Sequence, residues 1–255
     1  MMEGTYYKEW SAVLDREMEF KVYGHGGVPV LALPARGGRF YDWENNGMPD
    51  AAARLLNEGK IQLFCADSID GESLLAGNES PRRRAEMQAE VFRLPHQRAG
   101  RAHRGAERPE RKEKPLIWCV GVDTGAYQAV QCRLRRPGPL RVQWASPASD
   151  DMGRFLGSAE GTHRHPAGSE PPSPPCTRTA SATGNVLSKA EENSLMLCVG
   201  QGGYEGDALA DTQALADTLS EVGFPCHLEV WGGDVSHDWY WWGKEFGMFA
   251  ERLFG

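Results

Sequence analysis

The sequence lacks the features that mark several specialised classes of protein. It has no apolar run near the ~20 residues that a membrane-spanning helix needs. Residues 1–8 carry charges and no apolar core, so we expect no signal peptide and no membrane attachment. Lys and Arg number 28 against 35 Asp and Glu, and the resulting net charge of -7 argues against nucleic acid, which needs a basic surface. We therefore expect neither a membrane nor a nucleic-acid partner.

Cysteine is sparse and scattered. The six cysteines contain no Cys-x-x-Cys pair. Cys65, Cys119 and Cys198 each lie in an apolar run, which predicts buried free thiols in a reducing compartment and hence a cytoplasmic location. No cluster of metal-binding residues is visible, and no glycine-rich phosphate loop with a lysine follows a strand. We expect no metal and no cofactor.

Apolar runs at regular spacing predict an alternation of strands and helices. Residues 19–23 alternate in polarity, as in an outer strand. Continuous apolar runs, which are typical of parallel strands covered on both faces, occupy residues 28–33, 61–66, 116–120 and 195–199, with a last strand at 227–231. Helices are expected at 49–58 and 207–222. The pattern predicts an α/β fold with a mainly parallel sheet and helices on both faces, in a single domain spanning residues 1–255.

Two tracts, residues 94–114 and 137–184, depart from this pattern. The first holds arginine at five positions and almost no apolar residue, and the second contains eight of the sixteen prolines. Such compositions cannot bury a helix or strand face, so we expect both tracts to be irregular or disordered. An alternative is out-of-frame translation of a GC-rich gene, because both tracts fall where the fold needs a helix and a strand. Resequencing the gene would distinguish the two interpretations.

A sharp turn is expected directly after the strand at 116–120. The sequence there reads Gly121-Val122-Asp123-Thr124-Gly125-Ala126-Tyr127 and continues into a helix-compatible run. A strand, a tight turn flanked by glycines and a helix form the context of a nucleophile elbow, Gly-x-Ser-x-Gly. Both glycines are present, but Asp123 occupies the position of the serine. Aspartate tolerates the positive φ of such a turn better than most residues.

With these residues the chain resembles the esterases related to esterase D, whose elbow reads Gly-Cys-Ser-Met-Gly-Ala-Tyr. The resemblance covers roughly residues 6–93, 115–136 and 195–250, and includes the closing motif Trp231-Gly-Gly-Asp-Val-Ser-His-Asp-Trp239. It implies an α/β-hydrolase fold and a catalytic triad in the chain order nucleophile, acid, histidine. It also implies a small-molecule ester or acyl ligand.

The resemblance assigns roles to individual residues. Asp123 takes the position of the nucleophile, and His237, after the last strand, that of the base. The acid should follow the strand at 195–199, where we favour Glu205; Asp207 and Asp234 are the alternatives. Each of these carboxylates would equally suit the N-terminus of the following helix.

The expected oxyanion hole consists of two backbone N–H groups. One would belong to Thr124, directly after the elbow residue. The other would belong to Gly38 or Arg39, in the glycine-containing loop after the strand at 28–33.

The aspartate at the elbow leaves three interpretations open. Asp123 has no hydroxyl proton to give up, so acyl-serine chemistry should be weak or absent. The protein is then an esterase-like hydrolase with lost or weakened catalysis that keeps an acyl-binding pocket. Alternatively, Asp123 attacks an alkyl halide or an epoxide while His237 activates water. In the third case the gene product does not fold fully. The substrate and the oligomeric state stay open.

Overall fold

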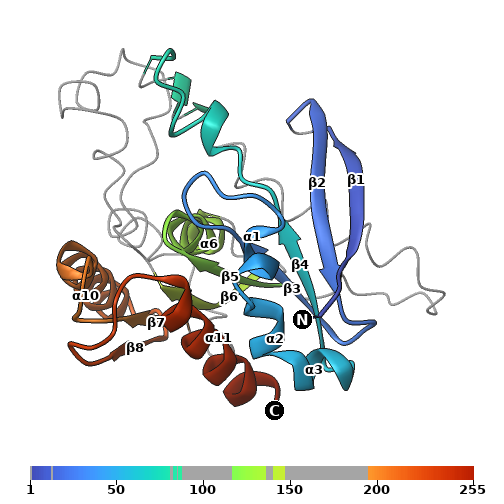
Figure 1. Ribbon diagram of the computed structural model, residues 1–255. Helices are drawn as coiled ribbons and strands as arrows, with labels where there is room; N and C mark the ends of the chain where they lie inside the picture. The colour runs from blue at the N-terminus through green and yellow to red at the C-terminus, as the bar shows by residue number, and fades with distance from the viewer. Residues whose placement is uncertain are drawn as a thin grey trace.

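The strands of the computed structural model form one eight-stranded sheet. The structure describes residues 2–87 (except 13, 81, 82 and 85), 117–135, 140–146 and 195–255. The strand order is β1-β2-β4-β3-β5-β6-β7-β8 (Figure 1). Strand β2 is antiparallel to β1 and β4, and the pairs from β4 through β8 are parallel. The strands are β1 (Thr5–Ser11), β2 (Arg16–Tyr23), β3 (Val28–Leu33), β4 (Ile61–Ala66), β5 (Ile117–Val122), β6 (Leu140–Ser146), β7 (Leu195–Val199) and β8 (Cys226–Val230). The mainly parallel sheet is confirmed, with an antiparallel ribbon at one edge.

Helices pack on both faces of the sheet, as predicted. Strand β3 shows the two layers, because its side chains alternate between them. Leu31 and Leu33 belong to a core cluster with α6 (Thr124–Arg135) and α10 (Gly206–Glu221). Val30 and Ala32 belong to a second cluster on the opposite face. That face is covered by α1 (Asp42–Asn45), α2 (Met48–Ala51), α3 (Ala53–Asn57) and α11 (Trp239–Phe254) (Figure 1).

The central strands bury the cysteines that lie in them. Cys65, Cys119 and Cys198 are buried free thiols, as the sequence predicts. Burial raises the pKa of the Cys65 and Cys119 thiols well above the ordinary value, so these groups stay protonated and inert at neutral pH.

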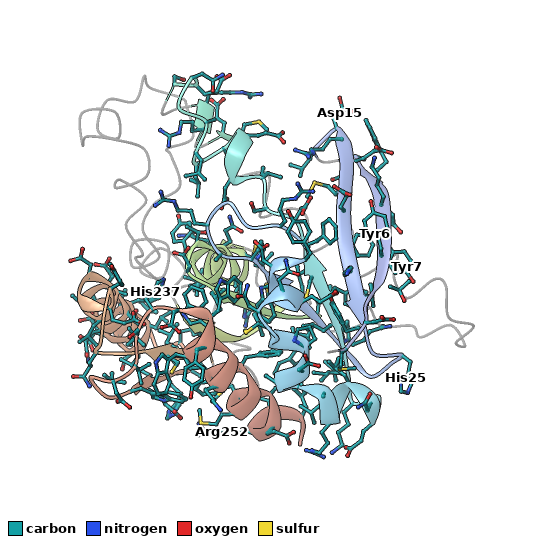
Figure 2. All side chains as sticks on the ribbon, in the orientation of Figure 1. Tyr6, Tyr7, Asp15, His25, His237 and Arg252 are labelled. Atoms are coloured by element: carbon teal, nitrogen blue, oxygen red, sulfur yellow. The ribbon has the colours of Figure 1, made fainter. Side chains whose placement is uncertain are left out.

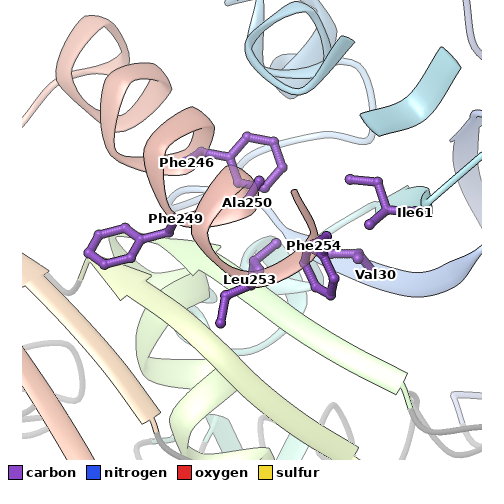
Figure 3. A pocket seen from close by; sticks show the side chains of 8 residues that line it. Val30, Ile61, Phe246, Phe249, Ala250, Leu253 and Phe254 are labelled. Carbon is purple, nitrogen blue, oxygen red and sulfur yellow. The ribbon is translucent and has the colours of Figure 1, made fainter. Parts of the chain in front are cut away.

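The cavity under α11 is too small for an organic ligand. It measures about 10 Å³, roughly the space of one water molecule. Eight apolar residues line it, among them Val30 and Ile61 of the sheet and Phe246 and Phe254 of α11 (Figure 3). It is a packing defect of the core.

The predicted helix at 49–58 is wrong in one respect, because it is broken at Ala52. That residue has ψ +19° and separates α2 from α3. Tertiary packing accounts for the break: α2 packs against α11, where a Cβ on Gly247 would lie 3.0 Å from the carbonyl oxygen of Ala51. The helix predicted at 207–222 is confirmed as α10.

The prediction that residues 137–184 are irregular is wrong at 140–146, which form β6. This strand pairs with β5 on one side and, through Ala145 and Leu197, with β7 on the other. Its pairing partners are remote in sequence, and the surrounding prolines hide its pattern. The rest of this tract and the whole of 94–114 lie outside the described residues. The out-of-frame interpretation stays a hypothesis, and the single-domain organisation stays a prediction.

Strand β1 was not predicted at all. It is an edge strand whose first six residues are exposed, so it carries no alternation of buried and exposed positions. Among the described helices, none combines the length and the hydropathy needed to cross a membrane.

Candidate active site

The chain turns sharply at Asp123, between β5 and α6. Asp123 has φ +54°, in the left-handed region. A Cβ on Gly121 would lie 2.3 Å from the carbonyl oxygen of Gly125, and a Cβ on Gly125 would lie 2.3 Å from that of Pro34. Glycine is therefore required on both sides of the turn, which explains the Gly-x-Asp-x-Gly pattern. The strand–turn–helix unit expected around residue 123 is present.

Two loops at the carboxyl ends of β7 and β8 are joined by backbone contacts. The N–H of Gly202 donates to the carbonyl of Val235 at 2.8 Å, and the N–H of His237 donates to that of Gly203 at 3.0 Å. A Cβ on Gly200 would lie 2.3 Å from the Val235 carbonyl oxygen, so the loops need glycine to approach this closely. This contact brings the residues after β7 beside His237.

The structure brings Asp123, His237 and Glu205 together. Nε2 of His237 lies 3.7 Å from Oδ1 of Asp123, and Nδ1 lies 3.4 Å from Oε2 of Glu205. Both distances exceed those of good hydrogen bonds, and such contacts are often long in ligand-free sites. Asp207 and Asp234, the alternative acids, are exposed, whereas the Glu205 side chain is only 1% exposed.

Burial increases along this row of side chains from Asp123 to Glu205. Asp123 is 17% exposed and His237 13%. The ring of Trp242, at the start of α11, meets the imidazole edge-on with 4.8 Å between the centroids. Figure 2 shows His237 on the opposite side of the view from Tyr6 and Tyr7 of the exposed edge strand. Of the three side chains, Asp123 is the most exposed to solvent.

The two carboxylates hold His237 as an imidazolium ion. Burial lowers the pKa of this side chain, but contacts with Asp123 and Glu205 raise it more, and the net pKa is raised from 6.5 to about 9. At neutral pH the imidazole is therefore protonated in the free protein. A protonated imidazole cannot accept a proton from a nucleophile.

A backbone amide that the sequence did not indicate reaches the elbow. The N–H of Arg36 donates to Oδ2 of Asp123 at 2.9 Å. The N–H of Gly38 donates to the Ala35 carbonyl at 2.8 Å, and that of Arg39 to Oδ2 of Asp42 at 2.9 Å. The amides of Gly38 and Arg39, either of which was expected at the elbow, thus bind other acceptors, and the Arg36 amide contacts Asp123 instead.

Thr124 is the first residue of α6. The first N–H groups of a helix have no acceptor within the helix, so the Thr124 amide is suited to bind a negative oxygen. Its hydroxyl lies 3.5 Å from Oδ2 of the buried Asp70, a residue that the sequence did not indicate either. Arg36 and Asp70 had no signal beyond lying within the stretches that carry the resemblance.

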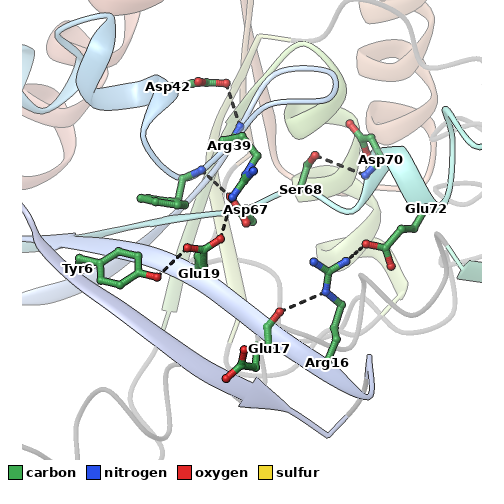
Figure 4. Close-up of polar contacts among 11 residues, drawn as sticks. Tyr6, Arg16, Glu17, Glu19, Arg39, Asp42, Asp67, Ser68, Asp70 and Glu72 are labelled. Atoms are coloured by element: carbon green, nitrogen blue, oxygen red, sulfur yellow. Dashed lines mark hydrogen bonds and ion pairs between the residues drawn. The ribbon is translucent and has the colours of Figure 1, made fainter.

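The side chain of Arg39 anchors the later part of the loop after β3, at Arg39 and Phe40. Its guanidinium binds Asp67 at 2.9 Å and Glu19 at 2.8 Å (Figure 4). The N–H of Phe40 donates to the same oxygen of Asp67 at 2.8 Å. Arg39 therefore ties the loop after β3 to β2 and to the end of β4.

Comparison with solved structures supports the fold, while neither a protein-family model nor a curated protein sequence matches the chain. An S-formylglutathione hydrolase from Staphylococcus aureus superposes with a TM-score of 0.68 at 10% identity, covering 100% of this chain and 97% of that chain. A ferulic acid esterase gives 0.66 at 15% identity and 100% coverage of both chains. A ferulic acid esterase from Anaeromyces mucronatus in complex with ferulic acid gives 0.68 at 11% identity, covering 98% and 90%. The chain has an α/β-hydrolase fold.

Across the residues that the structure describes, no group of three or more His, Cys, Asp or Glu side chains is arranged to hold a metal ion.

The packing of the elbow predicts that Gly125→Ala is strongly destabilising. The added Cβ meets the backbone of Leu33 and Pro34, which cannot move without distorting β3. We expect a loss of about 3 kcal/mol in unfolding free energy, measured by urea denaturation with tryptophan fluorescence. Gly206→Ala is the control, because a Cβ there has nothing within 4 Å. Equal midpoints for the two variants would show that the elbow is not tightly packed.

The environment of His237 predicts a pH-dependent stability. Its folded-state pKa is raised from 6.5 to about 9, so its ion pairs contribute fully below pH 6.5 and the contribution is lost as pH rises through about 9. The shift corresponds to at most about 3 kcal/mol. NMR of the imidazole protons should show titration near pH 9, and Glu205→Gln should lower that value. The His237→Gln variant should lack this part of the pH dependence. Titration near 6.5 in the unaltered protein would contradict the arrangement.

Proposed function

We propose that this protein is an esterase-like α/β-hydrolase whose site binds an ester or acyl ligand but hydrolyses esters weakly or not at all. The contact of His237 with both Asp123 and Glu205 carries this proposal. In this site Asp123 stands at the nucleophile position, His237 at that of the base and Glu205 at that of the acid.

The amides beside Asp123 support an acyl ligand. The Arg36 N–H already binds a carboxylate oxygen at the elbow, and the Thr124 N–H begins the adjoining helix. Two amides in this arrangement suit the oxygen of a carbonyl group on which negative charge develops. Esterases are also among the solved structures that share the fold.

Two features of the site oppose ester hydrolysis by the usual route. Attack of the Asp123 carboxylate on an ester carbonyl would give a mixed anhydride, which is less stable than the ester itself. In addition, Asp123 helps to keep His237 protonated, so the imidazole cannot act as a base. A serine would remove both obstacles at once, because its hydroxyl is neutral.

Restoring the serine tests the proposal. We expect Asp123→Ser to hydrolyse a short-chain aryl ester about 10³-fold faster than the unaltered protein or Asp123→Ala. Adding His237→Ala to Asp123→Ser should abolish the gain. If Asp123→Ser folds as the unaltered protein does and gains nothing, the triad assignment is abandoned.

One observation favours a second function, hydrolysis at an sp³ carbon. The Arg36 amide binds Oδ2 of Asp123 while Oδ1 faces His237, so the two oxygens have different environments. Oδ1 would attack the carbon of an alkyl halide and expel the halide, which leaves an alkyl ester on Asp123. Water would then attack the Asp123 carbonyl carbon, lose a proton to His237 and release the alcohol. Esterification neutralises Asp123, and the loss of that charge lowers the pKa of the imidazole, so it can act as the base.

Mass spectrometry separates this second function from the first. Incubation with a haloalkane or an epoxide should add one alkyl group to the peptide that contains Asp123, and a single turnover in ¹⁸O-labelled water should leave ¹⁸O in that carboxylate. His237→Gln should accumulate the ester, because the base of the second step is missing. An unlabelled Asp123 peptide after long exposure would eliminate this candidate.

A further inference from the structure

A completely buried carboxylate joins three segments behind the elbow. Asp70, the first residue of the 3₁₀ turn Asp70–Glu72 after β4, has 0% exposure. Its Oδ2 accepts the N–H of Gly37 at 2.9 Å, and its Oδ1 accepts the side-chain amide of Gln128 at 3.0 Å. The Thr124 hydroxyl lies 3.5 Å from Oδ2. One side chain thus connects the loop after β3, the loop after β4 and the first two turns of α6.

These partners lie next to the Arg36 amide, which binds Asp123, and to Thr124, which directly follows Asp123. Gly37 directly follows Arg36, whose N–H binds Asp123, and Gly37 has φ +67°. The two consecutive amides point in different directions, one to Asp123 and one to Asp70. Because they are separated by only one pair of backbone dihedrals, fixing the Gly37 amide restricts the direction of the Arg36 amide. On the other side, Thr124 supplies both a hydroxyl that faces Asp70 and the N–H at the start of α6.

Burial of a carboxylate in a protein core is costly unless hydrogen bonds compensate for the lost contact with water. Leu74, four residues after Asp70, and Ala126, in the first turn of α6, are also fully buried and belong to one core cluster. Burial raises the pKa of Asp70, although the Gly37 amide and Gln128 oppose the rise. The hydrogen bonds that compensate the burial are all directed at the two segments that carry the oxyanion-hole amides.

We propose that Asp70 is a positioning residue that sets the relative placement of the Arg36 and Thr124 amides. It thereby holds the two donors of the oxyanion hole in place. It does not touch the ligand. The inference rests on the proposed acyl site and adds to it a residue on which transition-state stabilisation depends.

Kinetics in the Asp123→Ser background test the inference. We expect Asp70→Ala to reduce kcat about 10²-fold with KM nearly unchanged, because an oxyanion-hole donor acts mainly in the transition state. Asp70→Asn should keep most of the activity: its amide oxygen accepts the Gly37 N–H, and the Gln128 amide can turn to accept from its NH₂. Rescue by the isosteric variant distinguishes positioning from a need for charge.

Asp67→Ala is the matched control. Asp67 is also buried, also follows β4 and also holds the loop after β3, but through Arg39 and Phe40. We expect it to lower stability without a comparable loss of kcat. An unchanged kcat in folded Asp70→Ala, or an equal kcat loss in Asp67→Ala, would overturn the inference. If Asp70→Ala does not fold, Gln128→Leu, which removes one donor to the carboxylate, should lower kcat about 10-fold at unchanged KM, and an unaffected kcat counts against the inference.

Amide hydrogen exchange in the unaltered background keeps this test separate from the proposed function. If Asp123→Ser gains no esterase activity, the proposed function fails, but exchange can still be measured. Asp70→Ala should then speed exchange at Gly37 and Arg36, and Asp70→Asn should restore protection. Unchanged protection in Asp70→Ala would overturn the role of Asp70 independently of any catalysis.

Discussion

The left-handed turn at Asp123 is the constraint on which the site depends. The turn forms only because Gly125 lies against the backbone at the end of β3 and Gly121 against Gly125. This close contact does more than expose one side chain. It places the start of α6 beside the loop after β3, so that the Arg36 amide comes within hydrogen-bond distance of the elbow. One backbone contact therefore sets both the position of Asp123 and a donor next to it.

The second constraint is electrostatic. A histidine between a buried acid and a neutral hydroxyl is a base, whereas a histidine between two carboxylates is a cation. In this structure His237 lies between Asp123 and Glu205, and its pKa is raised to about 9. The same geometry would support different chemistry depending on whether residue 123 carries a charge.

Much of the fold could be predicted because it follows from local pattern. The continuous apolar runs of β3, β4, β5 and β7 give the buried parallel strands, and the glycine spacing after β5 gives the turn. Strand β1 was not predicted, because an exposed edge strand shows no alternation of buried and exposed residues.

Other features depend on contacts between remote segments. Strand β6 is stabilised by backbone pairing with β5 and β7. The proline-rich sequence around it predicts irregular structure, so the strand was missed. In the site, the turn and the closing motif indicated Asp123 and His237, which the structure brings within 3.7 Å. The Arg36 amide and the Asp70 carboxylate could not be foreseen, because hydrogen bonds between loops that follow different strands leave no periodic trace in the sequence.

The crystal structure of Asp123→Ser after reaction with an aryl fluorophosphonate is the most direct test of the central claim. We expect a phosphonyl group on the introduced serine, one phosphonyl oxygen bound by the amides of Arg36 and Thr124, and Nε2 of His237 beside the serine oxygen. An adduct at any other residue, or a phosphonyl oxygen turned away from both amides, would contradict it.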